Sequence, residues 1–479
     1  MGTRTACLAS TATAERWGWL ALAVACTKPS SETHVSPPDT APHETEPQET
    51  AVPPALPFSV SAGPTPHTLV VAVTSSDRAE LRCDGAEAIP GVPERLEASS
   101  EGPNPTLQIH GLLAETDYEC SLVAGDATET FPWRTGRLPA EVTAFTWAVT
   151  DGAATARPAY VLFNAAPVDD ARAPQILVAV DRAGGVRWHT VVPGVDMGIA
   201  IEPTADGRVW AGGGAHLLMP PTLLAADGSV VATIDCPLCN HDVEPVGEDV
   251  WAIDGFGAES ACVVSFVGDE FAASRVCADE APGVFPAPFP GVNSISIGQG
   301  DQAGLVVVGI ATDPSVTAFS WPDATPLWRI GGAAPTLTGP TDDVFSYRVH
   351  DVNLAQGCGH EVCLLLYANR TEDVGSQIMM LGVDPSAGTW TVSAQWADPP
   401  WFAPVWGGAW PEEDGGWLVA IGQSADGATD PSVIVEVDPA TGAVKWRLEL
   451  EPMIGTYRAR SADPCVFLSH AGLCSASGA

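Results

Sequence analysis

Lysine is almost missing from this sequence, because Lys28 and Lys445 are the only two among 479 residues. Lysine and arginine together number 21 against 59 aspartates and glutamates, which gives a formal net charge of −38 at pH 7. Binding to nucleic acid, or to an anionic membrane by charge, requires a basic face that meets phosphate groups. We therefore expect no nucleic-acid partner and a soluble, self-repelling surface.

Long apolar runs are also scarce. Residues 17–25 form one short run, which Arg4 and Arg16 precede and Cys26 follows. The pattern is typical of a secretory signal peptide over residues 1–26, and the run is too short to span a bilayer as a mature helix. Because Ala-Val-Ala-Cys26 resembles a bacterial lipobox, we predict an exported protein that is lipid-anchored to the outer membrane and faces the periplasm or the cell surface. The alternative is ordinary signal cleavage with Cys26 incidental.

Large apolar residues are rare between residues 27 and 56, a stretch rich in proline, threonine, serine and glutamate. Such a composition cannot bury surface, so we predict a disordered, extended tether there. Residues 463–479 are expected to form a C-terminal tail. The whole chain is 46% apolar and has 47 glycines and 43 prolines, too many for a helical protein. These numbers indicate an all-β fold of many short strands joined by turns.

Twelve cysteines are present, and those after Cys26 fall into near-neighbour pairs. An even set with this spacing predicts disulfides in an oxidising compartment, rather than several zinc or catalytic pairs. A zinc site that includes His241 is an alternative for the pair directly before it. Haem attachment is excluded there, because the histidine does not follow the second cysteine at once. We expect no metal and five disulfides: Cys83–Cys120, Cys236–Cys239, Cys262–Cys277, Cys358–Cys363 and Cys465–Cys474.

Residues 57–137 contain short strand-like segments, such as 68–74, and predict a small β-sandwich of the immunoglobulin or fibronectin kind. The segment Gly111-Leu-Leu-Ala-Glu-Thr-Asp-Tyr118 resembles the fibronectin type III pattern, in which a tyrosine after a turn opens the next strand. His110 lies at the end of a strand-like segment and is interpreted as structural. The sequence indicates no functional site in this domain.

From residue 140 onward two hairpin patterns alternate. One is a glycine turn that leads into an apolar run, as at 204–210, and the other runs from Asp-x-x-Gly to a tryptophan, as at 438–446. Two hairpins make a four-stranded unit, and six such units predict a six-bladed β-propeller over residues 140–462, closed by residues 455–460. Two unrelated sandwiches or a seventh blade are the alternatives. The first inner strands should begin near Tyr160, Met197, His241, Asn293, His350 and Gly407.

In a propeller, the start of the innermost strand and the end of the second strand converge at one mouth of the central channel. A His-Asp pair at such a strand start is also compatible with a structural role that braces neighbouring blades, and the arginine with a rim salt bridge. Metal binding by the two histidines is a further alternative. The geometry predicts that six side chains from two blades meet at this mouth: His241, Asp242, His350, Asp351, Asn369 and Arg370.

These segments resemble the bacterial arylsulfate sulfotransferase family that uses no nucleotide sulfate donor. The resemblance covers residues 140–460 and implies a six-bladed periplasmic propeller that moves a sulfuryl group between phenols through a sulfated histidine. It implies no cofactor, and its partners are a small aromatic sulfate and a phenol; the oligomeric state is left open. The resemblance rests on His241-Asp242-Val-Glu-Pro, His350-Asp351-Val-Asn353-Leu, Tyr-Ala-Asn369-Arg370 and the segment from Trp406 to Val419.

The resemblance also implies roles for individual residues. A guanidinium and an amide suit a tetrahedral oxyanion, so an arginine and an asparagine would hold the sulfate oxygens. The family has a further histidine where residues 405–408 here read Val-Trp-Gly-Gly, so either His350 is the nucleophile or the chain binds without turnover. The alternative function is a non-catalytic secreted binding propeller for a glycan, phenolic or protein ligand. The implied site comprises catalytic His350, His241 and Arg370, and substrate-binding Asn369, Asn353, Asp242, Asp351 and Trp406.

Overall fold

The computed structural model describes residues 56–463 and Phe467, apart from internal gaps. The expected signal peptide, Cys26, the tether up to residue 55, and the cysteines Cys465 and Cys474 lie outside the described residues. So does Met197, the expected start of one inner strand. The gaps are 75–76, 86–94, 153–159, 169, 171–172, 193–197, 215–218, 256–260, 268–271, 279–290, 341–344, 346–347, 370–374, 398–401, 405 and 423–430.

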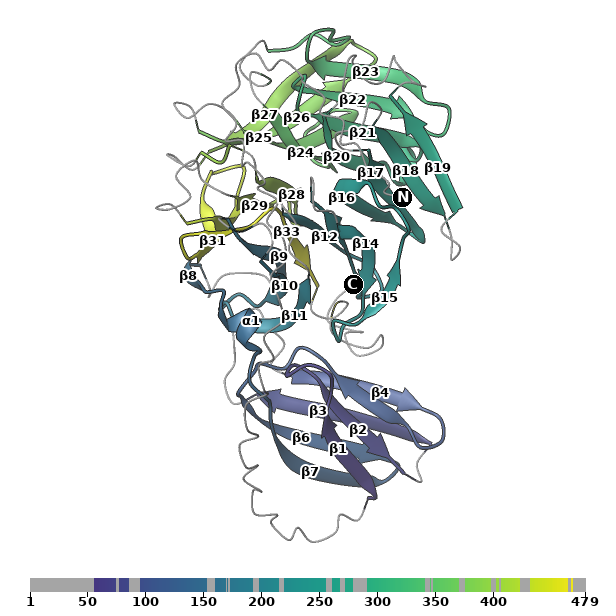
Figure 1. Cartoon of the computed structure of the whole chain (residues 1–479), viewed down its shortest axis with the longest axis vertical. Helices are drawn as coiled ribbons and strands as arrows, with labels where there is room; N and C mark the ends of the chain where they lie inside the picture. Colours follow the sequence, from purple (N-terminus) through teal and green to yellow (C-terminus); the bar gives the residue numbers. More distant parts are fainter. Residues whose placement is uncertain are drawn as a thin grey trace, which may run out of the picture. The chain divides into compact units, whose positions relative to one another are not determined.

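The first seven strands form a β-sandwich of a three-stranded and a four-stranded sheet around one apolar core (Figure 1). Burial alternates along the second strand, where Leu69, Val71 and Val73 are buried, because successive side chains point to opposite faces. The Tyr118 hydroxyl accepts a hydrogen bond from the Leu113 N–H at 2.8 Å, a contact of the tyrosine-corner kind. The fibronectin type III assignment itself still rests on the sequence pattern. The sheets are β1 (Phe58–Ala62), β2 (Leu69–Val73) and β5 (Thr106–Ile109), then β4 (Arg95–Glu101), β3 (Arg78–Gly85), β6 (Asp117–Ala124) and β7 (Ala127–Arg134).

Six antiparallel sheets follow and form a β-propeller, as predicted (Figure 1). Each is a blade, and the innermost strands of successive blades contact one another around the ring. Blades 2 to 5 each use four consecutive strands: β12 (Ile199–Pro203), β13 (Val209–Gly213), β14 (Met219–Leu224), β15 (Val230–Thr233); β16 (Cys239–Val246), β17 (Asp249–Asp254), β18 (Cys262–Val267), β19 (Ala272–Cys277); β20 (Val292–Ile297), β21 (Leu305–Ile310), β22 (Ser315–Ser320), β23 (Thr325–Gly331); β24 (Arg348–Ala355), β25 (Val362–Asn369), β26 (Gln377–Asp384), β27 (Thr389–Trp396).

The ring is closed by exchange of strands between the two ends of the propeller. In blade 1, β33 (Ala459–Ala462) pairs with β9 (Tyr160–Pro167), and β10 (Gln175–Val180) and β11 (Val186–Val192) follow outward. Blade 6 runs from β28 to β31 and gains β8 as a fifth, outer strand. Blade 6 and the linking elements are β28 (Gly408–Pro411), β29 (Trp417–Ile421), β30 (Val433–Val437), β31 (Val444–Leu450), β8 (Trp147–Asp151), β32 (Ile454–Gly455), helix α1 (Ala140–Thr143) and the 3-10 turn η1 (Gly300–Gln302).

One detail of the predicted blade order is wrong. The strand at Tyr160 was expected to be innermost in its blade, but β33 takes that place and β9 is second. The cause is the closing strand itself, because it inserts on the axis side of the first blade. The prediction that a strand from residues 455–460 closes the ring agrees with β32 and β33.

The blades pack on one another through tryptophans and apolar strands. All residues of β10 are buried, because its sheet is covered on both faces by neighbouring blades. Trp188, Trp446 and Trp417 are at most 1% exposed, and they lie between blades 1 and 2, blades 6 and 1, and blades 5 and 6 respectively. Trp210 and Trp251 pack in the same way, as expected from the sequence.

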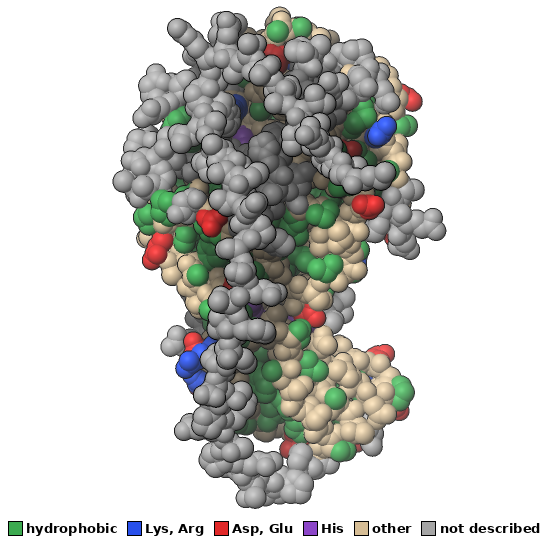
Figure 2. Space-filling view, viewed as in Figure 1, with side chains coloured by type: hydrophobic (Ala, Val, Ile, Leu, Met, Phe, Trp, Pro, Cys, Tyr) green, Lys and Arg blue, Asp and Glu red, His purple; other side chains and the backbone are tan. Residues whose placement is uncertain are grey.

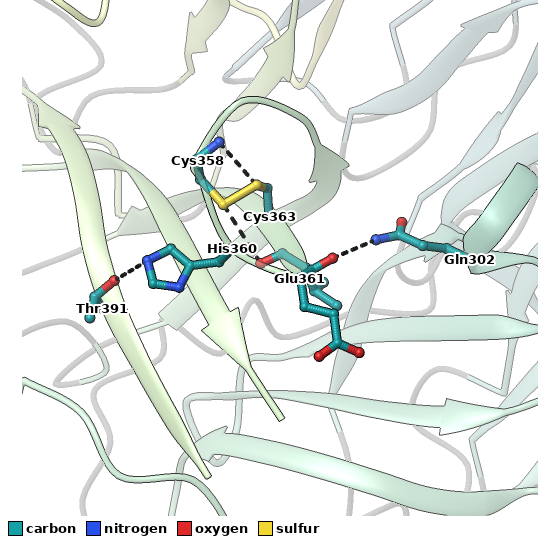
Figure 3. The surroundings of a disulfide bond; sticks show 7 residues. Gln302, Cys358, His360, Glu361, Cys363 and Thr391 are labelled. Carbon is teal, nitrogen blue, oxygen red and sulfur yellow. Dashed lines mark hydrogen bonds between the residues drawn. A yellow bond between two sulfur atoms is a disulfide. The ribbon is translucent and has the colours of Figure 1, made fainter. Parts of the chain in front are cut away.

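Four of the predicted disulfides are confirmed: Cys83–Cys120, Cys236–Cys239, Cys262–Cys277 and Cys358–Cys363. Figure 3 shows the last of these closing the loop between β24 and β25, where His360 lies beside Thr391, with 3.2 Å between Nε2 and Oγ1. This number of disulfides indicates an oxidising, exported compartment.

Acidic side chains are scattered over the described surface of the face in Figure 2 rather than gathered in one patch. This distribution agrees with the net charge of −38 and with a self-repelling surface. Within the described part of the chain, no helix is long and apolar enough to cross a membrane.

The cross-strand disulfide of blade 3 gives the first testable prediction. Replacing both cysteines (Cys262→Ala/Cys277→Ala) should lower the free energy of unfolding by about 3 kcal/mol, because the bond closes a loop with a sequence separation of 15. Urea denaturation under non-reducing conditions measures the loss. The matched control is Cys358→Ala/Cys363→Ala, where the separation is 5 and the loss should be smaller. An equal or larger loss in the control contradicts the argument from loop size.

Candidate functional site

Three innermost strands carry a β-bulge at their beginning. In β16 the extra residues are His241 and Asp242, in β20 the extra residue is Asn293, and in β24 it is His350. A bulged residue leaves the pairing ladder, and its side chain is re-aimed. His241 also has a φ of 56°, in the left-handed region that non-glycine residues seldom adopt. Local breaks in pairing therefore set the positions of both predicted histidines.

Beyond the bulges, alternate residues of each inner strand point toward the following blade. Arg460 of blade 1 pairs with Glu202 of blade 2, with 2.6 Å between Nη2 and Oε1. The Asn353 side chain of blade 5 donates to the Ala409 carbonyl of blade 6 at 2.8 Å. Equivalent positions on the six inner strands hold one residue each, which we call the glutamate layer: Glu202, Glu244, Ser296, Asn353, Trp410 and Arg460.

Arg458 lies fully buried two residues earlier in the chain and joins three blades. Its guanidinium bonds the Asp242 carboxylate directly, lies 3.6 Å from Asp351 Oδ1, and donates to the Asn293 carbonyl at 3.0 Å. Burial alone would lower the pKa of Arg458, but the two carboxylates outweigh it and raise the pKa above its ordinary value. We call Arg458, Asp242 and Asp351 the aspartate layer. It carries a permanent positive charge between two carboxylates.

The two aspartates of this layer also fasten each blade to the next. Asp242 Oδ2 accepts the Ile295 N–H of blade 4 at 2.8 Å, and Asp351 Oδ2 accepts the Ala409 N–H of blade 6 at 3.1 Å. Both carboxylates are at most 4% exposed. This is the bracing role that the sequence left open for the His-Asp pairs, and it occupies the oxygens that a substrate would need.

The glutamate layer holds a surplus of buried acid. Burial raises the pKa of Glu202 to about 7, although the paired Arg460 acts against it. Burial, followed by the charge of Glu202, raises the pKa of Glu244 well above its usual range. The Arg460 guanidinium also lies 4.3 Å from the centre of the Trp410 ring. This layer therefore holds at least one proton at neutral pH.

Tyr457 brings the two histidines together. Its hydroxyl is 3.3 Å from His241 Nδ1, and its ring meets the His350 ring edge-on with centroids 5.4 Å apart. The backbone N–H of Tyr457 donates to Asn164 Oδ1 at 2.8 Å. A Cβ at Gly198 would lie 1.8 Å from the tyrosine Cβ, so only glycine allows this approach. We call His241, His350 and Tyr457 the histidine–tyrosine cluster.

The hydrogen bonds of His350 fix its tautomer. Nδ1 lies 3.0 Å from the Gly407 carbonyl, which can only accept, so Nδ1 carries the proton and Nε2 keeps a lone pair. Burial lowers the pKa of His350 to about 3, and the charges of Arg458 and Arg348 lower it further. The imidazole is therefore neutral at physiological pH. Arg348 begins β24 and is a partly exposed cation close to the site.

The other predicted site residues are held by the framework. The Asn369 amide donates to the Ala403 carbonyl and, at 3.2 Å, to the Trp406 carbonyl. Trp406 is 6% exposed and packs with Ala166 and Tyr457. Its ring therefore stands behind the histidine–tyrosine cluster as part of the core.

Arg370 follows the last residue of β25 and lies outside the described residues. The structure thus brings together His241, His350, Asp242 and Asp351, and leaves Arg370 unplaced. Sequence reasoning treated Tyr457 and Arg458 only as part of the closing strand. The signal that could have found them is Tyr-Arg-Ala-Arg, two cations at alternate positions in a strongly acidic chain.

No family model matches the chain, and no curated protein matches it. Solved structures are similar in fold. TolB from Acinetobacter baumannii is 10% identical with a TM-score of 0.42, and the match covers 74% of this chain and 81% of that one. A putative 6-phosphogluconolactonase from Bacteroides uniformis is 15% identical with a TM-score of 0.40, covering 81% and 100%.

The β-propeller domain of Cps50 from Myceliophteria thermophila is 12% identical with a TM-score of 0.34, and the match covers 56% of this chain and 78% of that domain. At these values the likeness concerns the propeller fold and carries no argument about activity. The chain is an all-β propeller protein, and its chemistry has to be argued from its own residues.

The aspartate layer gives the second prediction. Arg458→Met should lower the free energy of unfolding by about 3–5 kcal/mol, because it leaves two buried carboxylates without their cation. Denaturant titration at neutral pH measures this. The control is Arg134→Met, which removes an exposed ion pair with Asp117 and should cost less than about 1 kcal/mol. A loss at Arg458 no larger than in the control would contradict the central role of this residue.

Proposed function

We propose that this protein transfers sulfuryl groups between phenols, in the manner of the arylsulfate sulfotransferases that its sequence resembles, with His350 as the group that is sulfated. The observation that supports it best is the tautomer of His350. Gly407 holds the Nδ1 proton at 3.0 Å, and within the described part of the chain nothing bonds to Nε2. A neutral imidazole with its lone pair available is a competent nucleophile.

The reaction runs in two balanced steps. In the first, the Nε2 lone pair forms an N–S bond while the S–O bond to the donor phenol breaks. The leaving phenolate takes a proton from His241, which the Tyr457 hydroxyl holds at 3.3 Å. In the second, the acceptor phenol attacks sulfur, the N–S bond breaks, and the phenol proton returns to His241.

The sulfate oxygens need a positive charge near His350. Arg458 and Arg460 are engaged by Asp242 and Glu202, so they contribute little to an incoming anion. Arg348 already acts on His350 through its charge and is partly exposed. The proposal assigns the sulfate to Arg348 together with Arg370, because a planar guanidinium suits a tetrahedral oxyanion.

A second candidate function is a binding propeller without turnover. It is favoured by Asp242, Asp351 and Asn369, whose polar atoms bond the protein framework. It is also favoured by residues 405–408, which lack the family's further histidine. Under this candidate the ligand is a glycan, a phenol or a protein segment. Under both, the protein is exported and is held at a membrane through a lipid on Cys26.

The third prediction separates these candidates. With a chromogenic aryl sulfate and a phenol acceptor, the wild-type protein should release the donor phenol. His350→Gln should reduce kcat by at least about 10³-fold, because the nucleophile is gone. Mass spectrometry after incubation with the donor alone should find one sulfuryl group on the peptide that contains His350.

The control for this experiment is His360→Gln, an exposed histidine in the disulfide loop of Figure 3, which should leave kcat unchanged. Arg348→Gln should raise KM more than it lowers kcat, because it holds the sulfate without entering the bond changes. Phenol release that persists in His350→Gln would disprove the role of His350. No release by the wild type, together with saturable binding of the aryl sulfate, favours the binding propeller.

A further inference from the structure

A second pair of histidines lies away from the channel, where the β-sandwich meets blade 1. His67 precedes β2, and His189 lies in β11, on the outer strand of the blade. His67 Nε2 is 2.9 Å from His189 Nδ1, and the rings meet edge-on with centroids 5.0 Å apart. The two residues are 2% and 5% exposed. Sequence reasoning considered only His110 in the sandwich and missed this contact.

The hydrogen bonds fix the proton positions in this pair. His67 Nδ1 lies 2.7 Å from the Leu112 carbonyl, which can only accept, so Nδ1 carries the proton and Nε2 is the acceptor. His189 must then donate its Nδ1 proton to His67, and its own Nε2 keeps a lone pair. The contact therefore needs a neutral His67. A proton on His67 Nε2 would set two N–H groups against each other.

The charges around the pair make a second cation costly. Arg187 of β11 donates to the Gly111 carbonyl of the sandwich at 3.0 Å and pairs with Asp181 at 2.7 Å. Asp181 is the carboxylate of this region, and it is already bonded by Arg187 and by the N–H groups of Ala183 and Gly185.

The remaining titratable groups that face this region are two phenols, a histidine and an aspartate. Tyr118 of β6 and Tyr160 of β9 both interact electrostatically with Arg187, and burial raises the pKa of each. His110 follows β5, with its Nδ1 3.2 Å from Thr68 Oγ1, and Asp227 interacts with His110. In the described part of the chain, no carboxylate contacts His67 or His189, so nothing compensates a charge on either.

We propose that the hydrogen bond between His67 and His189 is an acid-sensitive contact that holds the sandwich against blade 1 at neutral pH and releases it on acidification. One added proton can be accepted at His189 Nε2 with the contact intact. A second proton must go to His67, where it removes the only acceptor and adds a charge beside Arg187. This inference does not depend on the proposed sulfuryl transfer.

The direction and pH window follow from proton binding. Burial lowers the pKa of His67 to about 3, with the charge of His189 adding to it, and burial lowers the pKa of His189 to about 4. Released into water, both should titrate near 6.5. The released state then binds more protons below pH 6.5, so docking is complete above that pH and weakens as the pH falls toward 4. Each histidine should contribute about a 10-fold loss in the docking constant per pH unit within this window.

The test is the distance between the two domains in the full chain. Donor and acceptor dyes are placed at exposed Thr130 in β7 and Val230 in β15 through non-natural amino acids, which leaves the disulfides untouched. Energy transfer is read from single molecules, because the sequence pI of about 4.3 favours association of the protein in acid. The wild type should show one docked population at about pH 7.5 and a growing separated population toward about pH 4.5, with tryptophan fluorescence of the propeller unchanged.

Three variants decide the outcome. His67→Gln/His189→Asn removes both titrating groups and should stay docked in acid, and His360→Gln, an exposed histidine elsewhere, should behave as the wild type. Identical energy transfer at both pH values in the wild type overturns the proposal, as does separation of the double variant at the wild-type pH. If the double variant is already separated at neutral pH, His189→Asn decides instead. A shallower pH dependence than in the wild type then supports the proposal, and an unchanged one overturns it.

Discussion

The buried guanidinium of Arg458 is the interaction on which the rest of this structure depends. It has no exposed surface, and its partners are Asp242, Asp351 and the Asn293 carbonyl, which belong to three different blades. A buried charge is stable only when opposite charges and hydrogen bonds surround it. The guanidinium therefore fixes how far apart three inner strands can be, and the tryptophans between the blades fill the space that this spacing leaves.

The histidine–tyrosine cluster takes its geometry from the same layer. His241 directly precedes Asp242, and His350 directly precedes Asp351, so fixing each carboxylate also fixes the bulge that aims each imidazole. Tyr457 precedes Arg458 in the same way and reaches both histidines. Structural and chemical roles are thus divided between neighbouring residues: the carboxylate or guanidinium holds the framework, and the preceding ring is presented to a ligand.

Much of the fold could be predicted from the sequence, because turns and apolar alternation are local. The repeated hairpins gave the blades, and the near-neighbour cysteines gave the four described disulfides. The site was harder, since its decisive pairings are distant: Arg458 and Asp242 are 216 residues apart, and a bulge leaves no mark in the pattern of apolar residues. The contact of His67 with His189 spans 122 residues and two domains, so no local reasoning could find it.

The closing strand has a consequence for the order in which the molecule can be assembled. Arg458 and Arg460 arrive just before and within β33, the last strand of the ring. Until it docks, Asp242, Asp351 and Glu202 face one another across an apolar interior without a cation, and their mutual repulsion opposes closure. An unfinished ring is thus propped open by its own charges. The chain passes from an open arc to a complete ring in one late event, and the mouth with its two imidazoles exists only afterwards.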